Sequence, residues 1–115
     1  MNIQIYGKAK CFETKKAERY FKERRIKYQF VDVPKYGMSK GEYNSVKNAL
    51  GGMEALVDVK SKEYEAQYMA YLADSGDKEA RLLDNPGMFK TPIVRNGRKA
   101  TIGYQPDVWD IWQGG

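Results

Sequence analysis

Cys11 is the only cysteine of this chain, and the chain contains no histidine. A single cysteine cannot form a disulfide within the chain, and neither Ser-His-Asp nor Cys-His catalysis is available without histidine. A zinc site built from Cys and His ligands is excluded for the same reason, and we expect no metal site. The chemistry that remains is that of one thiol, which acts as a nucleophile when its pKa is low enough to give a thiolate.

The segments on either side of Cys11 suggest such a pKa. Residues 2–6 alternate in the manner of a strand, and residues from Phe12 or Glu13 to 25 have the apolar spacing of a helix. A cysteine at a helix N-terminus faces unpaired backbone N–H groups and the positive end of the helix dipole, and both favour the thiolate. The alternative is a buried and inert cysteine. The expected stabilising groups are the amides of Glu13 and Thr14, the Thr14 hydroxyl, and the charges of Lys8, Lys10 and Lys15.

Thr14 limits the mechanism open to this thiol. Many thiol-disulfide oxidoreductases use C-x-x-C, in which the second thiol resolves the mixed disulfide, and here Thr14 stands at that second position. Any redox cycle must therefore be monothiol. It would be completed by an external thiol such as glutathione, as co-substrate, or by a partner protein, and we expect no bound cofactor.

The surplus positive charge is concentrated around Cys11. The first 30 residues hold nine Lys or Arg and three Glu, whereas the remainder holds eleven basic and twelve acidic side chains. The basic helix face is either simply solvated or docks an acidic protein partner. The sequence argues against nucleic-acid binding, because its aromatic side chains are not interleaved with the charge in a recognisable motif.

Composition predicts one soluble domain spanning residues 1–115. The chain has 42% hydrophobic residues, which is typical of a globular protein. No apolar run has the length of a membrane span, and the first residues lack the apolar core of a signal peptide, so we expect a cytoplasmic protein without membrane association.

Beyond the first helix, the pattern predicts a second strand at residues 27–33, ended by Pro34. A helical insertion of about residues 39–84 follows. Ser39 and Glu42 form a capping-box pattern at its start. A further helix is predicted to begin at Ser61, to continue through Tyr64, Tyr68, Tyr71 and Leu72, and to end at about residues 74–76, with a short helix of about residues 77–83 after it.

The last third of the sequence predicts a hairpin and a helix. Asn96-Gly97 between strands 92–95 and 98–102 is typical of a type I′ turn, and Pro106 suits the first turn of a helix. The element order is then β-α-β, helical insertion, β-β-α. This is the thioredoxin-like arrangement of an α/β fold with a four-stranded mixed sheet.

Three segments resemble the arsenate reductase-like (ArsC/Spx/YffB) family of the thioredoxin superfamily. They are residues 5–33 around Cys11, VDVKSKEY at residues 57–64, and NPGMFKTPIVRNGRKATIGYQPDVW at residues 85–109. The resemblance implies that Cys11 is the catalytic cysteine and that Thr91-Pro92 is a cis peptide facing it. It also implies that the backbone of Thr91 pairs with a thiol substrate. Without the resemblance, Pro92 is equally consistent with the start of an edge strand.

The departures from the family make arsenate a disfavoured substrate. Members that reduce arsenate hold the oxyanion with arginines, and the corresponding positions here are occupied by Thr91 after Lys90, by Asp58 and Lys60, and by Tyr104 or Gln105. Lysine balances charge but lacks the bidentate fork of arginine. We expect Lys8, Lys60 and Lys90 to attract the carboxylates of glutathione or another anion.

These observations leave two main hypotheses. The first is a monothiol, glutathione-dependent oxidoreductase that uses Cys11 as the nucleophile. The second is a non-catalytic interaction module, similar to the Spx-type members of the family, which regulate transcription by binding RNA polymerase. The C-x-x-C redox switch of those members is absent here, because Thr14 replaces its second cysteine.

Overall fold

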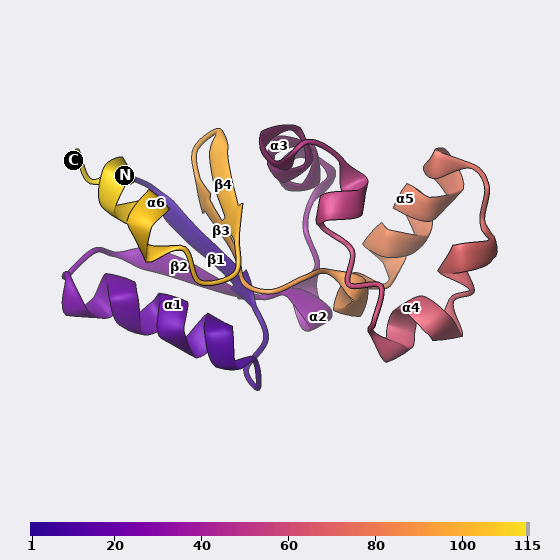
Figure 1. Cartoon of the computed structure of the whole chain (residues 1–115), viewed down its shortest axis with the longest axis horizontal. Coiled ribbons are helices and arrows are strands. Elements are labelled where there is room, and N and C mark those ends of the chain that lie inside the picture. Colours follow the sequence, from indigo (N-terminus) through magenta and orange to yellow (C-terminus); the bar gives the residue numbers. More distant parts are fainter. Residues whose placement is uncertain (115) are drawn as a thin grey trace.

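A computed structural model describes residues 1–114, in which four strands form one mixed sheet in the order β2-β1-β3-β4 (Figure 1). The central strand β1 (Ile3–Gly7) pairs in parallel with β2 (Tyr28–Asp32) and antiparallel with β3 (Ile93–Asn96). The edge strand β4 (Lys99–Ile102) pairs antiparallel with β3. The α/β class, the thioredoxin-like arrangement and the mixed four-stranded sheet are therefore confirmed.

Helices α1 (Phe12–Glu23) and α6 (Pro106–Trp112) cover one face of this sheet (Figure 1). Because side chains of a strand alternate between faces, Ile3 and Ile5 of β1 point to this side. They form one buried cluster with side chains of both helices, namely Ala17, Tyr20, Phe21 and Trp109, and with Val94 of β3. This packing fixes α1, and hence its N-terminus, against the end of β1.

On the opposite face, the short helix α2 (Val33–Tyr36) and helix α3 (Lys40–Leu50) pack against the sheet. The predicted helical insertion contains α3 and two further helices, α4 (Lys62–Ala66) and α5 (Ser75–Asp84), which lie farther from the sheet (Figure 1). Short 3-10 turns lie at residues 53–55, 69–71 and 86–88. The second buried cluster combines Tyr6 of β1 and Ile93 of β3 with residues of the segment between β2 and β3, namely Val33, Tyr43, Val46, Met53, Leu56, Val57, Met69, Leu82, Met88 and Phe89.

The predicted capping box at the start of α3 is confirmed. The amide of Glu42 donates to the Ser39 hydroxyl at 3.1 Å, and the amide of Ser39 donates to the Glu42 carboxylate at 3.0 Å. Gly51 ends the helix with φ +88°, a left-handed conformation that glycine adopts without a steric penalty. Tyr6 also donates to the Glu42 carboxylate, which links α3 to the central strand.

The predicted long helix from Ser61 is wrong. It begins as expected, since the Ser61 hydroxyl accepts from the amide of Tyr64 at 3.1 Å, but α4 ends at Ala66. Tyr68 has φ +53°, which breaks the helical path, and Tyr68 and Tyr71 are exposed. Asp74, expected to lie at the end of this helix, instead caps α5 by accepting from the amide of Gly76.

The β3–β4 hairpin exists, but its turn type was predicted incorrectly. Asn96 pairs with Lys99, so the two turn residues are Gly97 and Arg98. Only Gly97 has a positive φ, +61°, whereas a type I′ turn needs a positive φ at both positions. The turn therefore has glycine at its first central position, as a type II′ turn does.

None of the helices in residues 1–114 combines the length and the apolar character needed to cross a membrane.

Candidate active site

Cys11 is the N-cap residue of α1 and is joined to the end of β1 by the turn of residues 8–10. Its amide donates to the carbonyl of Lys8 at 3.0 Å, and its carbonyl accepts from the amide of Lys15 at 3.3 Å. Its backbone is extended, with φ −81° and ψ 120°, as is usual for an N-cap residue. The side chain is partly exposed. The expected strand-to-helix position of the thiol is therefore present.

Thr14 lies in α1, three residues after Cys11, and packs closely against Gly7 at the end of β1. Thr14 is buried, and its Oγ1 accepts from the amide of Lys8 at 3.4 Å. A Cβ built on Gly7 would lie 2.4 Å from Thr14 Cγ2 and 2.8 Å from Thr14 Oγ1, which is too close for any side chain. Glycine at position 7 is thus required by the approach of Thr14. The sequence signal for this role is weak, since Gly7 is marked only by its location directly after the predicted strand of residues 2–6.

Hydrogen bonding lowers the pKa of the Cys11 thiol. Burial acts in the opposite direction and raises the pKa, but hydrogen bonds from the side chains of Thr14 and Thr91 and from the amides of Thr14 and Glu13 outweigh it. These are the donors expected at a helix N-terminus, because they favour the charged thiolate. The side chain of Glu13 extends toward Gly103, so Glu13 acts on the thiol through its amide.

Thr91-Pro92 lies opposite the thiol and is a cis peptide. The thiol group of Cys11 is 3.7 Å from the carbonyl oxygen of Thr91, to which it donates when it is protonated. The carbonyl of Pro92 accepts from the amide of Gly103 at 2.8 Å, which ties this peptide to the end of β4. The geometry that the family resemblance implied for Thr91-Pro92 and Cys11 is therefore present. The proposed pairing of Thr91 with a substrate stays a prediction.

The predicted lysines differ in their contacts. Lys8 lies in the turn before Cys11, and its ammonium group donates to the carbonyl of Gly87 at 3.0 Å. Lys60 and Lys90 are exposed, and their two segments meet through backbone contacts: Asp58 N–H donates to Met88 O at 2.8 Å, and Lys90 N–H donates to Leu56 O at 2.7 Å. Lys10 and Lys15 are also exposed. Their predicted roles toward the thiolate or a substrate stay predictions.

Three side chains near the start of α1, namely Phe12, Lys16 and Tyr104, were not predicted to contribute to the site. Phe12 follows Cys11 directly and is 72% exposed, an unusual position for so large an apolar side chain. The ammonium group of Lys16 lies 5.0 Å from the centre of the Phe12 ring and 5.6 Å from that of Tyr104. The available signal was that Phe12 does not share the spacing of the buried residues of α1.

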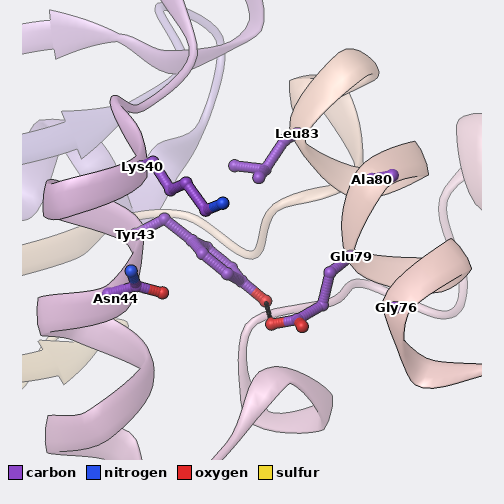
Figure 2. A pocket seen from close by; sticks show the side chains of 7 residues that line it. All are labelled: Lys40, Tyr43, Asn44, Gly76, Glu79, Ala80 and Leu83. Atoms are coloured by element: carbon purple, nitrogen blue, oxygen red, sulfur yellow. Dashed lines mark hydrogen bonds between the residues drawn. The ribbon is translucent and has the colours of Figure 1, made fainter.

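A hollow of about 350 Å³ lies elsewhere, between α3 and α5, and is shown in Figure 2. The hydroxyl of Tyr43 points at Glu79 and donates to its carboxylate at 2.6 Å, and Lys47 pairs with the same carboxylate at 2.9 Å. These polar groups satisfy one another, so we interpret the hollow as part of the packing between two helices. Its lining residues are Lys40, Tyr43, Asn44, Gly76, Glu79, Ala80 and Leu83.

The fold and the thiol at the first helix define a thioredoxin-like protein with one cysteine at the position where such proteins carry a reactive thiol. The chain matches the ArsC family over residues 6–111, and it belongs to that family. This confirms the family resemblance of the three sequence segments.

Known relatives come from two groups. A sequence relative is the global transcriptional regulator Spx 2 of Oceanobacillus iheyensis, 24% identical over 109 residues that cover 93% of this chain and 80% of the relative. Similar solved structures are an arsenate reductase from Vibrio cholerae and an arsenate reductase-related protein from Brucella melitensis, at 21% and 22% identity with TM-scores of 0.79 and 0.67. The first match covers 94% of both chains, and the second covers 98% of this chain and 95% of the other. Identities this low establish the fold and leave the reaction open.

Proposed function

We propose that this protein is a monothiol, glutathione-linked thiol oxidoreductase in which Cys11 is the nucleophile. The observation that carries the proposal is the lowered pKa of a partly exposed cysteine at the N-terminus of α1. Thiolates at such positions are the reactive species in disulfide exchange, because the thiol form is a poor nucleophile. Membership of the ArsC family supports a thiol oxidoreductase of this general kind.

The proposed cycle starts with a substrate thiol that is joined to glutathione by a disulfide. The Cys11 thiolate attacks the glutathione sulfur, the S–S bond breaks, and the substrate leaves as a thiolate that takes up a proton. A second glutathione thiolate then attacks the Cys11–glutathione disulfide. Cys11 leaves as the thiolate, so each turnover restores one substrate thiol and forms one glutathione disulfide.

Thr14 explains why the resolving thiol must come from outside. It occupies the position of a second cysteine, and Cys11 is the only cysteine of the chain. The Thr14 hydroxyl can donate a hydrogen bond to the thiolate. Because Thr14 is buried, it cannot itself react with a substrate. Lys8, Lys60 and Lys90 are proposed to attract the glutathione carboxylates.

Arsenate reduction remains the less favoured reaction. The family resemblance assigns Thr91, Asp58 and Lys60, and Tyr104 or Gln105 to the positions at which members that reduce arsenate carry arginine. A carboxylate repels arsenate, and neither a threonine nor a tyrosine hydroxyl supplies the fixed pair of donors of a guanidinium. Arsenate-dependent turnover in the presence of glutathione and glutaredoxin would reverse this preference.

The test is the rate of Cys11 alkylation by iodoacetamide as a function of pH. We expect the midpoint to lie below the value of about 8.5 for a free cysteine. Incubation with oxidised glutathione should then add one glutathione to wild type, as detected by mass, and none to Cys11→Ser. A midpoint at the free-cysteine value, with no glutathione adduct, would rule out the redox role.

A second candidate function is a transcriptional regulator or interaction module, and it is favoured by the name of the Oceanobacillus relative. In this case Cys11 would be dispensable for the main contact. Capture of a partner from lysate with wild type and Cys11→Ser separates the two candidates. A partner retained equally by both forms supports the regulator, whereas a disulfide-linked partner seen only with Cys11 supports the oxidoreductase.

A further inference from the structure

One face of α1 begins beside the thiol with an aromatic ring and carries charged side chains toward the end of the helix. Residues three or four apart on a helix share a face, and Phe12, Lys16, Arg19 and Glu23 follow this spacing. The face opposite packs on the sheet through Ala17 and Phe21. The stripe is therefore a surface continuous with the site at Cys11.

This stripe forms the floor of a groove of about 310 Å³. Tyr104, from the segment before α6, forms the other wall, and the lining residues are Lys16, Arg19, Tyr20, Glu23, Arg24 and Tyr104. Three of the lining side chains are cations and one is an anion. The groove therefore presents a surplus of positive charge along the part of α1 that follows Cys11.

Once Arg24 is paired with Asp110, the groove lining still holds two cations, Lys16 and Arg19, against one anion, Glu23. The guanidinium of Arg24 lies 3.7 Å from the centre of the Tyr20 ring and 4.0 Å from the carboxylate of Asp110, so this arginine is partly compensated. The ammonium group of Lys16 lies near the rings of Phe12 and Tyr104, at the distances given above, and forms no ion pair within residues 1–114. Arg19 is exposed on the helix surface. Lys16 and Arg19 are thus the cations most available to a ligand.

We propose that this groove binds an acidic segment of a protein substrate whose disulfide reacts with Cys11. The inference rests on the proposed function of Cys11 and names the class of substrate that it would serve. Charge complementarity points to a carboxylate-rich partner, and the exposed rings of Phe12 and Tyr104 supply apolar contact next to the reacting sulfurs.

The length of the groove favours a polypeptide over glutathione alone. Lys16 is five residues and Arg24 is thirteen residues from Cys11, which corresponds to about 7 Å and about 20 Å along a helix. An extended glutathione, with three residues, reaches about 10 Å. An extended peptide covers the same stretch with acidic residues about two to six positions from its reacting cysteine.

The experiment uses synthetic peptides in which one cysteine carries a thiopyridyl group. The Cys11 thiolate attacks the peptide sulfur, the mixed disulfide forms, and pyridine-2-thione leaves, so its absorbance reports the rate. One set of peptides carries glutamates two to six positions from the cysteine, on either side. A matched set carries the same glutamates ten or more positions away, and a third set carries glutamines.

We expect at least one peptide with near glutamates to react about tenfold faster than its matched peptides, with the advantage lost at high ionic strength. Arg19→Glu should remove the advantage. Arg98→Glu makes the same charge change in the exposed β3–β4 turn and should preserve it. The rate with neutral dithiodipyridine should be equal in wild type and both variants, because that small disulfide does not use the groove.

Three results would overturn the inference. Equal rates for near, far and neutral peptides, with normal reaction of dithiodipyridine, would refute the acidic groove and leave the proposed function intact. Failure of Cys11 to react even with dithiodipyridine would refute both. Stronger inhibition by a single-stranded oligonucleotide than by a cysteine-free acidic peptide would reassign the groove to nucleic acid.

Discussion

Thr14→Val tests whether one hydroxyl sets the reactivity of Cys11. Valine keeps the branched shape that packs against Gly7 and removes the hydroxyl, with its hydrogen bond to the sulfur and the bond that it accepts from the amide of Lys8. A hydrogen bond to a charged group contributes about 1.5–3 kcal/mol. Sulfur is a weak acceptor and Cys11 is partly exposed, so we reduce this to about 1 kcal/mol. At 1.36 kcal/mol per unit, the pKa of Cys11 should rise by about 0.5–1 unit.

The assay is iodoacetamide alkylation across a pH series, followed by mass. Below its pKa, the thiolate fraction of Thr14→Val should fall, and the alkylation rate with it, by about threefold to tenfold. Thr14→Ser keeps the hydroxyl and should retain the wild-type midpoint.

Thr101→Val is the matched control for this prediction, because Thr101 is the other buried threonine and its hydroxyl accepts from Trp109 at 2.8 Å rather than facing the sulfur. It should reduce stability and leave the midpoint unchanged. If folded Thr14→Val titrates with the wild-type midpoint, the assignment of the lowered pKa to this hydroxyl is wrong.

Three further predictions concern stability. Gly7→Ala should lower the free energy of unfolding, measured in urea, by about 1–3 kcal/mol, because its Cβ overlaps Thr14. The added change Thr14→Ala should recover part of this loss. An unaltered urea midpoint in Gly7→Ala would contradict the close approach of Gly7 and Thr14. Gly41→Ala should instead stabilise the protein by about 0.5 kcal/mol, because this position in α3 has no atom within 4 Å of the added Cβ; a loss of stability would contradict it. Since the native state lowers the pKa of Cys11, the stability advantage of wild type over Cys11→Ser should be fully present above the unfolded value of about 8.5 and decline as the pH falls through the native pKa, as measured by unfolding at several pH values.

The parts of the fold that could be predicted from the sequence are those set by local chemistry. The capping box of Ser39 and Glu42 satisfies backbone amides within one turn, so the sequence alone predicts the start of α3. The end of α4 could not be predicted in this way, because Tyr68 is held in a left-handed conformation that ordinary propensity disfavours. The central residues of the hairpin turn, Gly97 and Arg98 rather than Asn96 and Gly97, could not be predicted locally either, because the pairing register of the two strands determines them.

The candidate site likewise has some features that local sequence determines and others that packing between elements determines. The position of Cys11 and the amides of Glu13 and Thr14 depend on backbone geometry at a strand-to-helix junction, and the sequence predicts that junction. The closeness of Gly7 to Thr14 depends on packing of the α1 start against the end of β1, which no local pattern contains. The exposed ring of Phe12 likewise becomes informative only when the buried face of α1 is known.

Thr14 also bears on why a protein of this family can dispense with a second cysteine. Its side chain is 1% exposed, so no external disulfide can reach position 14 while the site is folded. Exchange with substrates must then pass through Cys11, which is partly exposed, whatever residue lies behind it. A threonine there still contributes, because its hydroxyl favours the thiolate of Cys11 without offering a competing thiol. Replacing a resolving cysteine by threonine therefore removes the internal second step while keeping the nucleophile of the first step charged.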